Sequence, residues 1–167
     1  MTLVIDASVV LRSLVPSPDD AQSCEQAAAF LARVAEREYP VLQPPHWLMD
    51  VAGALLAISP QTAGRDLTLL AALEWPECRE PGALIRACEL AVRLRRPIRE
   101  TLYHAVALEA EDGVLITADA SYRRAARRIA GVLSIEEWRS GDDEPARSRG
   151  GGSRQRVTAT RATRSDG

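Results

Sequence analysis

Residues 99–119 read RETLYHAVALEAEDGVLITAD, and this stretch contains the change of pattern that decides the fold. Its first half is amphipathic, and its second half contains the apolar run Val114–Thr117. We therefore expect a helix over about 99–111, followed by a buried strand. Two acids stand at the ends of this unit: Glu100 lies in the first turn of the helix, and Asp119 lies two residues beyond the strand. An acid in either place can simply stabilise a helix N-terminus, so the rest of the chain must decide what they do.

Short apolar runs and amphipathic segments alternate along the remaining sequence. The runs TLVID at 2–6 and VLSI at 132–135 predict strands, and a shorter strand is expected at Val41–Gln43. Apolar residues at helical spacing predict further helices within residues 17–38, 45–58, 62–75, 82–94 and 121–130. Strands separated by helices indicate an α/β fold with a central, mainly parallel sheet and helices on both of its faces.

The composition bounds the class of protein. A chain of 167 residues with 46% hydrophobic residues is long enough for one domain with a real core. All 21 basic residues are Arg, and the absence of Lys excludes a P-loop or a Schiff-base enzyme. No apolar run approaches the ~20 residues of a membrane span, and no leader segment is visible, so we expect a cytoplasmic protein. Cys24, Cys78 and Cys88 lack the spacing of a metal finger and are expected to be small core residues in a reducing cytosol.

The C-terminal part of the chain has a different character. Residues 140–167 contain almost no large apolar side chain and are rich in Gly, Ser, Thr and Arg. Such a segment cannot bury enough surface to offset the entropy of ordering, so we expect a folded domain over 1–139 and a disordered tail over 140–167.

Four acids are candidates for one common site. In open α/β sheets ligands bind at the carboxyl ends of the strands, where Asp6 ends the first strand and Asp119 follows a later one. Asp50 and Glu100 lie early in their helices, next to the buried stripe of each. Four carboxylates in one cleft repel one another unless a cation holds them, and oxygen ligands select Mg²⁺ or Mn²⁺. The chemistry of such a site is the hydrolysis of a phosphodiester.

Further polar residues surround these acids in the sequence. Ser8 and Thr117 can bond a carboxylate, a metal-bound water or a phosphate. His104 shares a helix face with Glu100 and can bond it, although a partly buried structural histidine is the favoured interpretation. An arginine strip follows Asp119 and can bind an RNA backbone or form an ordinary solvated helix surface; it contains Arg123, Arg124, Arg127 and Arg128.

Three segments together resemble the PIN-domain family, and within it the toxins of the VapC type. They are VIDASVVL (4–11), PPHWLMDVAGALL (44–56) and RETLYHAVALEAEDGVLITAD (99–119), in the order and spacing of the family's motifs. The resemblance covers about residues 1–138 and implies a three-layer α/β/α fold. It places the family's metal-binding acids on Asp6, Asp50, Glu100 and Asp119. The sequence has Asp50 where the family usually has Glu, Glu100 where it usually has Asp, and Gly53 where it usually has Asn.

The resemblance also implies a function. It is that of an Mg²⁺- or Mn²⁺-dependent endoribonuclease, the toxin of a toxin–antitoxin pair, with an RNA substrate, a cognate antitoxin and a homodimer. The apolar segment 55–73 can supply a dimer surface.

Two other functions compete with this one. The exchanged acids Asp50 and Glu100 are compatible with a PIN-fold module that binds RNA or protein without cutting. An aspartyl-phosphate phosphatase would also have an acid after its first strand. However, that chemistry needs a second Asp two residues later, where this chain has Ser8, and the absence of Lys also disfavours it.

Overall fold

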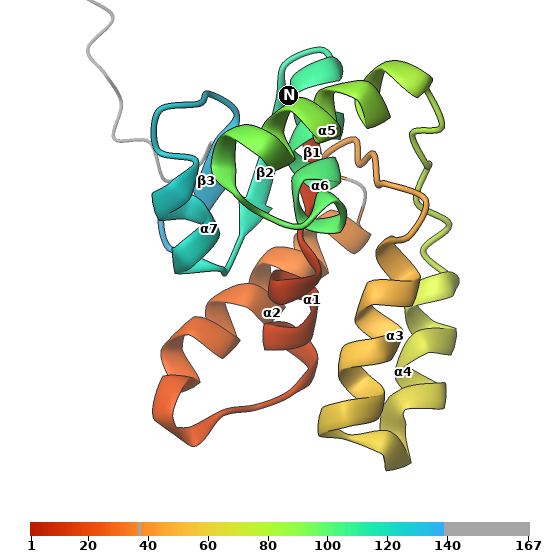
Figure 1. Ribbon diagram of the computed structural model, residues 1–167. Helices are drawn as coiled ribbons and strands as arrows, with labels where there is room; N and C mark the ends of the chain where they lie inside the picture. Colours follow the sequence, from red (N-terminus) through yellow and green to blue (C-terminus); the bar gives the residue numbers. More distant parts are fainter. Residues whose placement is uncertain (37, 139–167) are drawn as a thin grey trace, which may run out of the picture.

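The protein is an α/β fold built around a small parallel sheet (Figure 1), seen in a computed structural model that describes residues 1–36 and 38–138. The strands are β1 (Thr2–Ile5), β2 (Gly113–Thr117) and β3 (Val132–Ser134), in the order β1-β2-β3. All pairing is parallel, with Ile5 opposite Ile116 and Thr117 opposite Ser134. The carboxyl ends of the three strands therefore meet at one edge, as the sequence predicts. The predicted tail, residues 140–167, lies outside the described residues.

Helices make up most of the described chain. They are α1 (Ala7–Leu14), α2 (Ala21–Ala35), α3 (Trp47–Ile58), α4 (Pro60–Ala71), α5 (Pro81–Leu94), α6 (Ile98–Glu109) and α7 (Ala120–Ala125), with a 3₁₀ turn η1 at Pro18–Asp20. Helix α6 packs on β1 and β2, and α5 packs on α6. Helix α1 contacts β2 and packs against α2 and α3, while α3 and α4 lie side by side (Figure 1).

The predicted helices within 17–38, 45–58, 62–75, 82–94 and 99–111 are confirmed, but α1 was missed. Its apolar run Val9–Leu11 continues directly from β1 and resembles a longer strand in the sequence. In the structure the chain turns into a helix immediately after Asp6, and both Val9 and Val10 become fully buried. The last helix is also shorter than predicted, because α7 ends at Ala125 and turns follow it.

The expected strand at Val41–Gln43 is present only as isolated pairings. Val41 bridges Leu3, and Gln43 bridges Glu77, both in the parallel sense. Two prolines follow Gln43 and, having no N–H group, cannot extend a ladder of hydrogen bonds.

The side chain of Gln43 takes the place of a neighbouring strand at the free edge of β1. Its Oε1 accepts from the backbone N–H of Ile5 at 3.0 Å, and its Nε2 donates to the carbonyl of Ile5, also at 3.0 Å. Gln43 is fully buried. These two bonds satisfy the last residue of β1, and thereby support the position of Asp6, which comes next.

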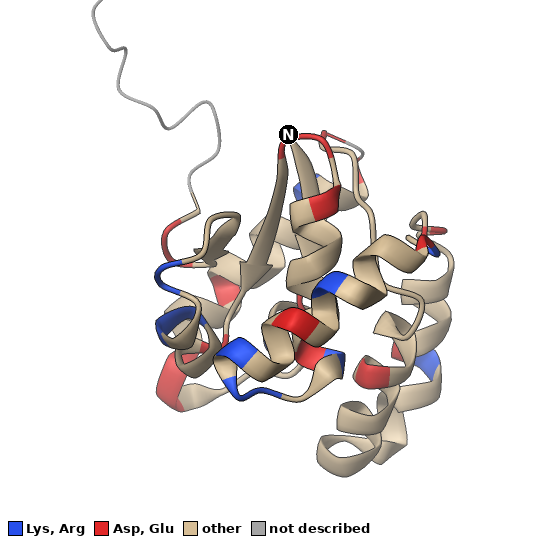
Figure 2. Cartoon of the chain, turned by 45° about the horizontal axis from the view of Figure 1, so that its top comes forward, with Lys and Arg blue, Asp and Glu red and all other residues tan. Residues whose placement is uncertain are grey.

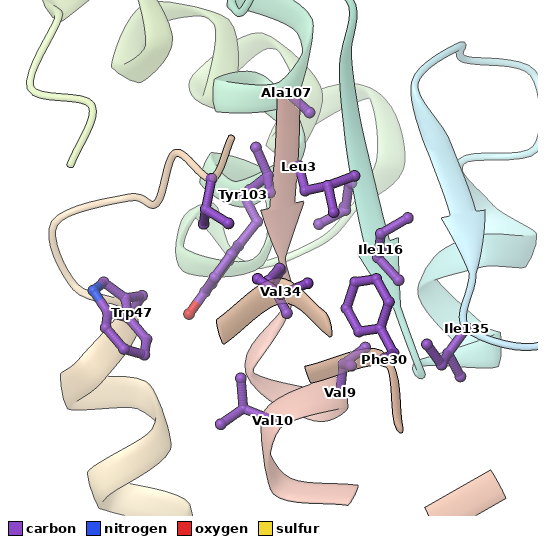
Figure 3. Close-up of a cluster of buried hydrophobic side chains, with 14 of the residues drawn as sticks. Leu3, Val9, Val10, Phe30, Val34, Trp47, Tyr103, Ala107, Ile116 and Ile135 are labelled. Carbon is purple, nitrogen blue, oxygen red and sulfur yellow. The ribbon is translucent and has the colours of Figure 1, made fainter. Parts of the chain in front are cut away.

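The core surrounds the sheet and joins segments that are far apart in the sequence. Figure 3 shows Leu3 and Ile116 from the sheet packed with Val9, Phe30 and Ile135. None of the three cysteines is fully buried, contrary to the prediction: Cys88 is exposed, and Cys24 and Cys78 are half-buried, with Cys78 packed against the core. In the described residues no helix is both long and apolar enough to cross a membrane.

Replacement of Gln43 tests this edge of the sheet. In Gln43→Leu the N–H and C=O groups of Ile5 lose their partners inside the protein, which costs about 2–4 kcal/mol of the free energy of unfolding. Urea denaturation measures the loss. Gln22→Leu, a change at an exposed position of α2, is the control and should alter stability by less than about 0.5 kcal/mol. Equal effects of the two substitutions would contradict this role of Gln43.

Candidate functional site

Three of the four predicted acids line one cavity. Asp6 follows β1, Asp50 lies in the first turn of α3, and Glu100 lies in the first turn of α6. Together with Arg99 and Tyr103 they line a cavity of about 530 Å³. The cavity lies at the carboxyl ends of the strands, because the N–H group of Asp6 donates to the carbonyl of Ile116 at 2.9 Å.

Two hydroxyl groups hold the carboxylate of Asp6 at this edge. Ser8 Oγ and Thr117 Oγ1 each donate to Asp6 Oδ2 at 2.6 Å. The same hydroxyl oxygens accept from the backbone, Ser8 from Ala118 N and Thr117 from Asp119 N, each at 3.0 Å. Of the three partners that the sequence allows for Ser8 and Thr117, the structure shows the carboxylate. These hydrogen bonds connect the start of α1 to the loop after β2, and they turn Oδ2 of Asp6 toward that loop.

The electrostatic state of Asp6 is unusual. Burial raises the pKa of this carboxyl group, the charge of Asp119 raises it further, and the hydrogen bonds from Ser8 and Thr117 act in the opposite direction. Asp6 is the N-cap residue of α1, yet its side chain makes no capping hydrogen bond. The helix-cap interpretation therefore does not account for this acid.

Asp119, in contrast, does cap a helix. Its Oδ1 accepts from the backbone N–H groups of Ser121 at 2.8 Å and Tyr122 at 3.0 Å, at the start of α7. Asp119 does not line the cavity of the other three acids. It lies beside that cavity, on the loop that Thr117 connects to Asp6, and its charge acts on Asp6.

Asp50 is held by three neighbours. Its Oδ2 lies 3.3 Å from the hydroxyl of Tyr103 and 3.3 Å from Nε2 of His46, and its Oδ1 lies 3.8 Å from Nη1 of Arg99. Burial raises the pKa of Tyr103, and the charge of Asp50 raises it further, so the phenol stays protonated as a donor. Figure 3 shows the Tyr103 side chain extending alongside β1.

Glu100 carries the unsatisfied atom of the site. Its Oε2 is buried and has no hydrogen-bond partner among the residues described. The nearest cation is Arg96, whose Nη1 lies 3.8 Å away and whose Nη2 donates to Ser121 Oγ. A buried carboxylate oxygen without a hydrogen bond is costly even with an arginine at this distance, and a closer cation is the partner that would satisfy it best.

The residues fit a divalent cation in their chemistry, but their side chains do not form a ready-made cage. Asp6, Asp50 and Glu100 offer only oxygen ligands, as Mg²⁺ and Mn²⁺ prefer, and Glu100 Oε2 lacks a partner. However, within the described ranges no three His, Cys, Asp or Glu side chains are close enough to hold one metal ion together. Arg96 and Arg99 balance part of the acidic charge instead.

His104 does not take part in the site. It is fully buried, with Nδ1 at 3.2 Å from the hydroxyl of Tyr122 and Nε2 at 2.8 Å from the carbonyl of Ala130. Burial lowers the pKa of this histidine, although the bond to Ala130 opposes the shift. Its spacing from Glu100 suggested a contact, but its ring nitrogens bond Tyr122 of α7 and Ala130 of the turn beyond it, as the structural interpretation expects.

The sequence analysis missed four residues that contact the acids: His46, Arg96, Arg99 and Tyr103. His46 and Arg96 each lie four residues before the acid they meet, so helical spacing was a usable signal for both. For Arg99 and Tyr103 no local pattern was available, because they meet Asp50 across the gap between α3 and α6.

Within the predicted arginine strip, Arg123, Arg124 and Arg127 are not equivalent. Arg123 forms a bidentate ion pair with Glu137, with Nε at 2.9 Å from Oε2 and Nη2 at 3.1 Å from Oε1. Arg124 and Arg127 are exposed and line a second cavity, of about 600 Å³, beside Ala118 and Ala120.

Stability as a function of pH tests the burial of Asp6. Since folding raises its pKa, the contribution of Asp6 to stability is fully present below the unfolded pKa and is lost as pH rises through the folded pKa. In EDTA, Asp6→Asn should therefore raise the unfolding temperature at pH 7.5, with the gain shrinking toward pH 4. Calorimetry of both proteins over this range checks it. A difference that does not change with pH would contradict the raised pKa.

Two substitutions of Asp119 separate its cap from its charge. Asp119→Ala should lower the free energy of unfolding by about 1 kcal/mol, because two N–H groups of α7 lose their acceptor. Asp119→Asn keeps an equivalent cap and should stay within a few tenths of a kcal/mol of the parent protein. Chemical denaturation measures both; equal losses would show that the cap contributes nothing.

Comparison of the sequence with models of protein families gives no match, and comparison with curated proteins gives none either. The functional argument therefore depends on the geometry of the site.

Proposed function

We propose that this protein is a metal-dependent endoribonuclease with a PIN-like three-layer fold, acting in the cytoplasm as the toxin of a VapBC-type toxin–antitoxin pair. One observation carries the proposal: Asp6, Asp50 and Glu100, distant in the sequence, line a single cavity at the carboxyl ends of parallel strands. The resemblance of the three motifs to the PIN-domain family supports the same conclusion.

Asp6, Asp50, Glu100 and Asp119 would hold Mg²⁺ or Mn²⁺. When bound, such an ion supplies a more acidic water and neutralises charge at the phosphorus centre. Ser8 and Thr117 keep the Asp6 carboxylate oriented, and the protonated phenol of Tyr103 keeps Asp50 in place. Arg99, whose side chain is 68% exposed at the rim, is able to leave Asp50 and pair with a phosphate of the RNA.

Partners are proposed from the resemblance: a cognate antitoxin and a second copy of the chain. Exposed apolar side chains on α3 and α4 support a partner surface there, and they belong to Met49, Leu56, Ile58 and Leu69. Three of these four lie within the segment 55–73 that the sequence analysis assigns to a dimer.

A PIN-fold module that binds RNA or protein without cleaving it is the second candidate. Arg96 and Arg99 are already paired with Glu100 and Asp50, and in the part of the chain that is described no three metal-ligating side chains converge. These observations favour a site that works without a metal ion.

Cleavage of RNA separates the two candidates. The nuclease should cut single-stranded RNA with Mn²⁺ or Mg²⁺ and not with EDTA, and Asp6→Asn should reduce the rate by at least about 100-fold, as loss of a ligand does. Asp119→Asn, which preserves the cap, should also reduce it. Asp19→Asn, at an exposed position of η1, is the control. Product analysis on gels measures the rates; activity that survives EDTA or Asp6→Asn would refute the proposal, and RNA binding without cleavage would support the module.

A further inference from the structure

A second cavity is lined by residues that neighbour Asp119 in the sequence. The residues on both sides of this acid, Ala118 and Ala120, line the second cavity. Ser8 and Thr117, which bond Asp6 of the acidic cavity, also accept from the backbone of Ala118 and Asp119, so this segment connects the two cavities. An extended strand of RNA with its cleavage position near Asp6 would reach the second cavity by crossing this segment.

Basic and acidic side chains both line the second cavity, but most of them neutralise one another. Arg12 lies 2.9 Å from Glu136 and 3.7 Å from Asp20, and its Nη2 donates to the carbonyl of Ala118 at 3.2 Å. Arg123 is held by both carboxylate oxygens of Glu137. These pairs form the wall of the cavity, and they join α1 and α7 to the turn after β3.

Arg124 and Arg127 are the cations that remain available. Both are exposed, and neither forms an ion pair with any residue in 1–36 or 38–138. Figure 2 shows the basic residues gathered on α7, with acidic residues beside them. Four arginines face three acids in this cavity, so a net positive charge is left, and it is located on Arg124 and Arg127.

We propose that Arg124 and Arg127 form a phosphate-binding subsite for single-stranded RNA next to the acidic cavity, while Arg12 and Arg123 only build its wall. Guanidinium groups bind phosphate oxygens through paired hydrogen bonds, and an exposed pair of them fits two positions along a flexible backbone. The inference rests on the proposed ribonuclease function, but it separates Arg124 and Arg127 from Arg12 and Arg123. It also requires an extended substrate, because a strand must cross the segment around Asp119 to reach both cavities.

The salt dependence of RNA binding tests the subsite. A fluorescein-labelled single-stranded RNA of mixed sequence is titrated with the full chain in EDTA, so that no cleavage occurs, at several salt concentrations. For single strands the slope of log K against log salt is about −0.7 per phosphate neutralised, so the double variant Arg124→Gln, Arg127→Gln should have a slope smaller in magnitude by about 1.4. Residues of the tail are the same in every variant and cancel in the comparison.

Two single variants serve as matched controls. Arg123→Gln removes a neighbouring charge of the same helix and should leave the slope unchanged, as should Arg65→Gln on α4. An unchanged slope in the double variant, an equal loss in Arg123→Gln, or no RNA binding by the parent protein would overturn the inference. A changed slope in a protein that never cleaves RNA would support the subsite and refute the nuclease, whereas cleavage with an unchanged slope would do the reverse.

Discussion

The hydrogen bonds from Ser8 and Thr117 to one oxygen of Asp6 are the interaction on which the site depends. They join the two strand ends that the parallel pairing of β1 and β2 brings together, and they connect Asp6 to the loop that carries Asp119. Gln43 supports the same place from the free edge of β1 by bonding both backbone groups of Ile5. Because β1 is short, these side chains provide hydrogen bonds that a longer sheet would otherwise provide. The position of the first acid is thus determined by side-chain hydrogen bonds as much as by the sheet.

The negative charge of the acids around Asp6 is incompletely balanced by cations. Burial and the charge of Asp119 raise the pKa of Asp6, and Glu100 keeps a buried oxygen without a hydrogen bond. Arg96 and Arg99 oppose the negative charge, each from 3.8 Å. Direct charged hydrogen bonds are about 1 Å shorter, so these two arginines compensate the acids weakly. The arrangement is suited to exchanging its arginine partners for a stronger cation. In the proposed ribonuclease this exchange would connect the geometry to phosphodiester chemistry, and it would account for acids that line one cavity without forming a cage.

Sequence patterns predicted the helices and strands better than they predicted the contacts between side chains. Buried runs located β1, β2 and β3. Of the four acids that strand ends and first turns of helices indicated, Asp6, Asp50 and Glu100 line one cavity and Asp119 does not. The helix α1 was not recognised, because it begins directly after β1 with no break in the sequence and its apolar residues Val9–Leu11 are consecutive, as in a buried strand. The partners of His104 come from α7 and the turn beyond it, and the salt bridge of Arg123 comes from the turn after β3. Contacts of this kind depend on how elements pack, and no spacing within one helix reports them.

Diffraction from crystals soaked in Mn²⁺, collected at the manganese absorption edge, tests the central claim most directly. The account predicts an anomalous peak in the cavity at the carboxyl ends of β1 and β2, with Asp6 as a ligand and with Glu100 turned from Arg96 toward the ion. Absence of a peak there at millimolar Mn²⁺, with Arg96 and Arg99 still paired to Glu100 and Asp50, would contradict it. The cavity would then be an arginine-compensated surface, and the acids that define it would have no metal to hold.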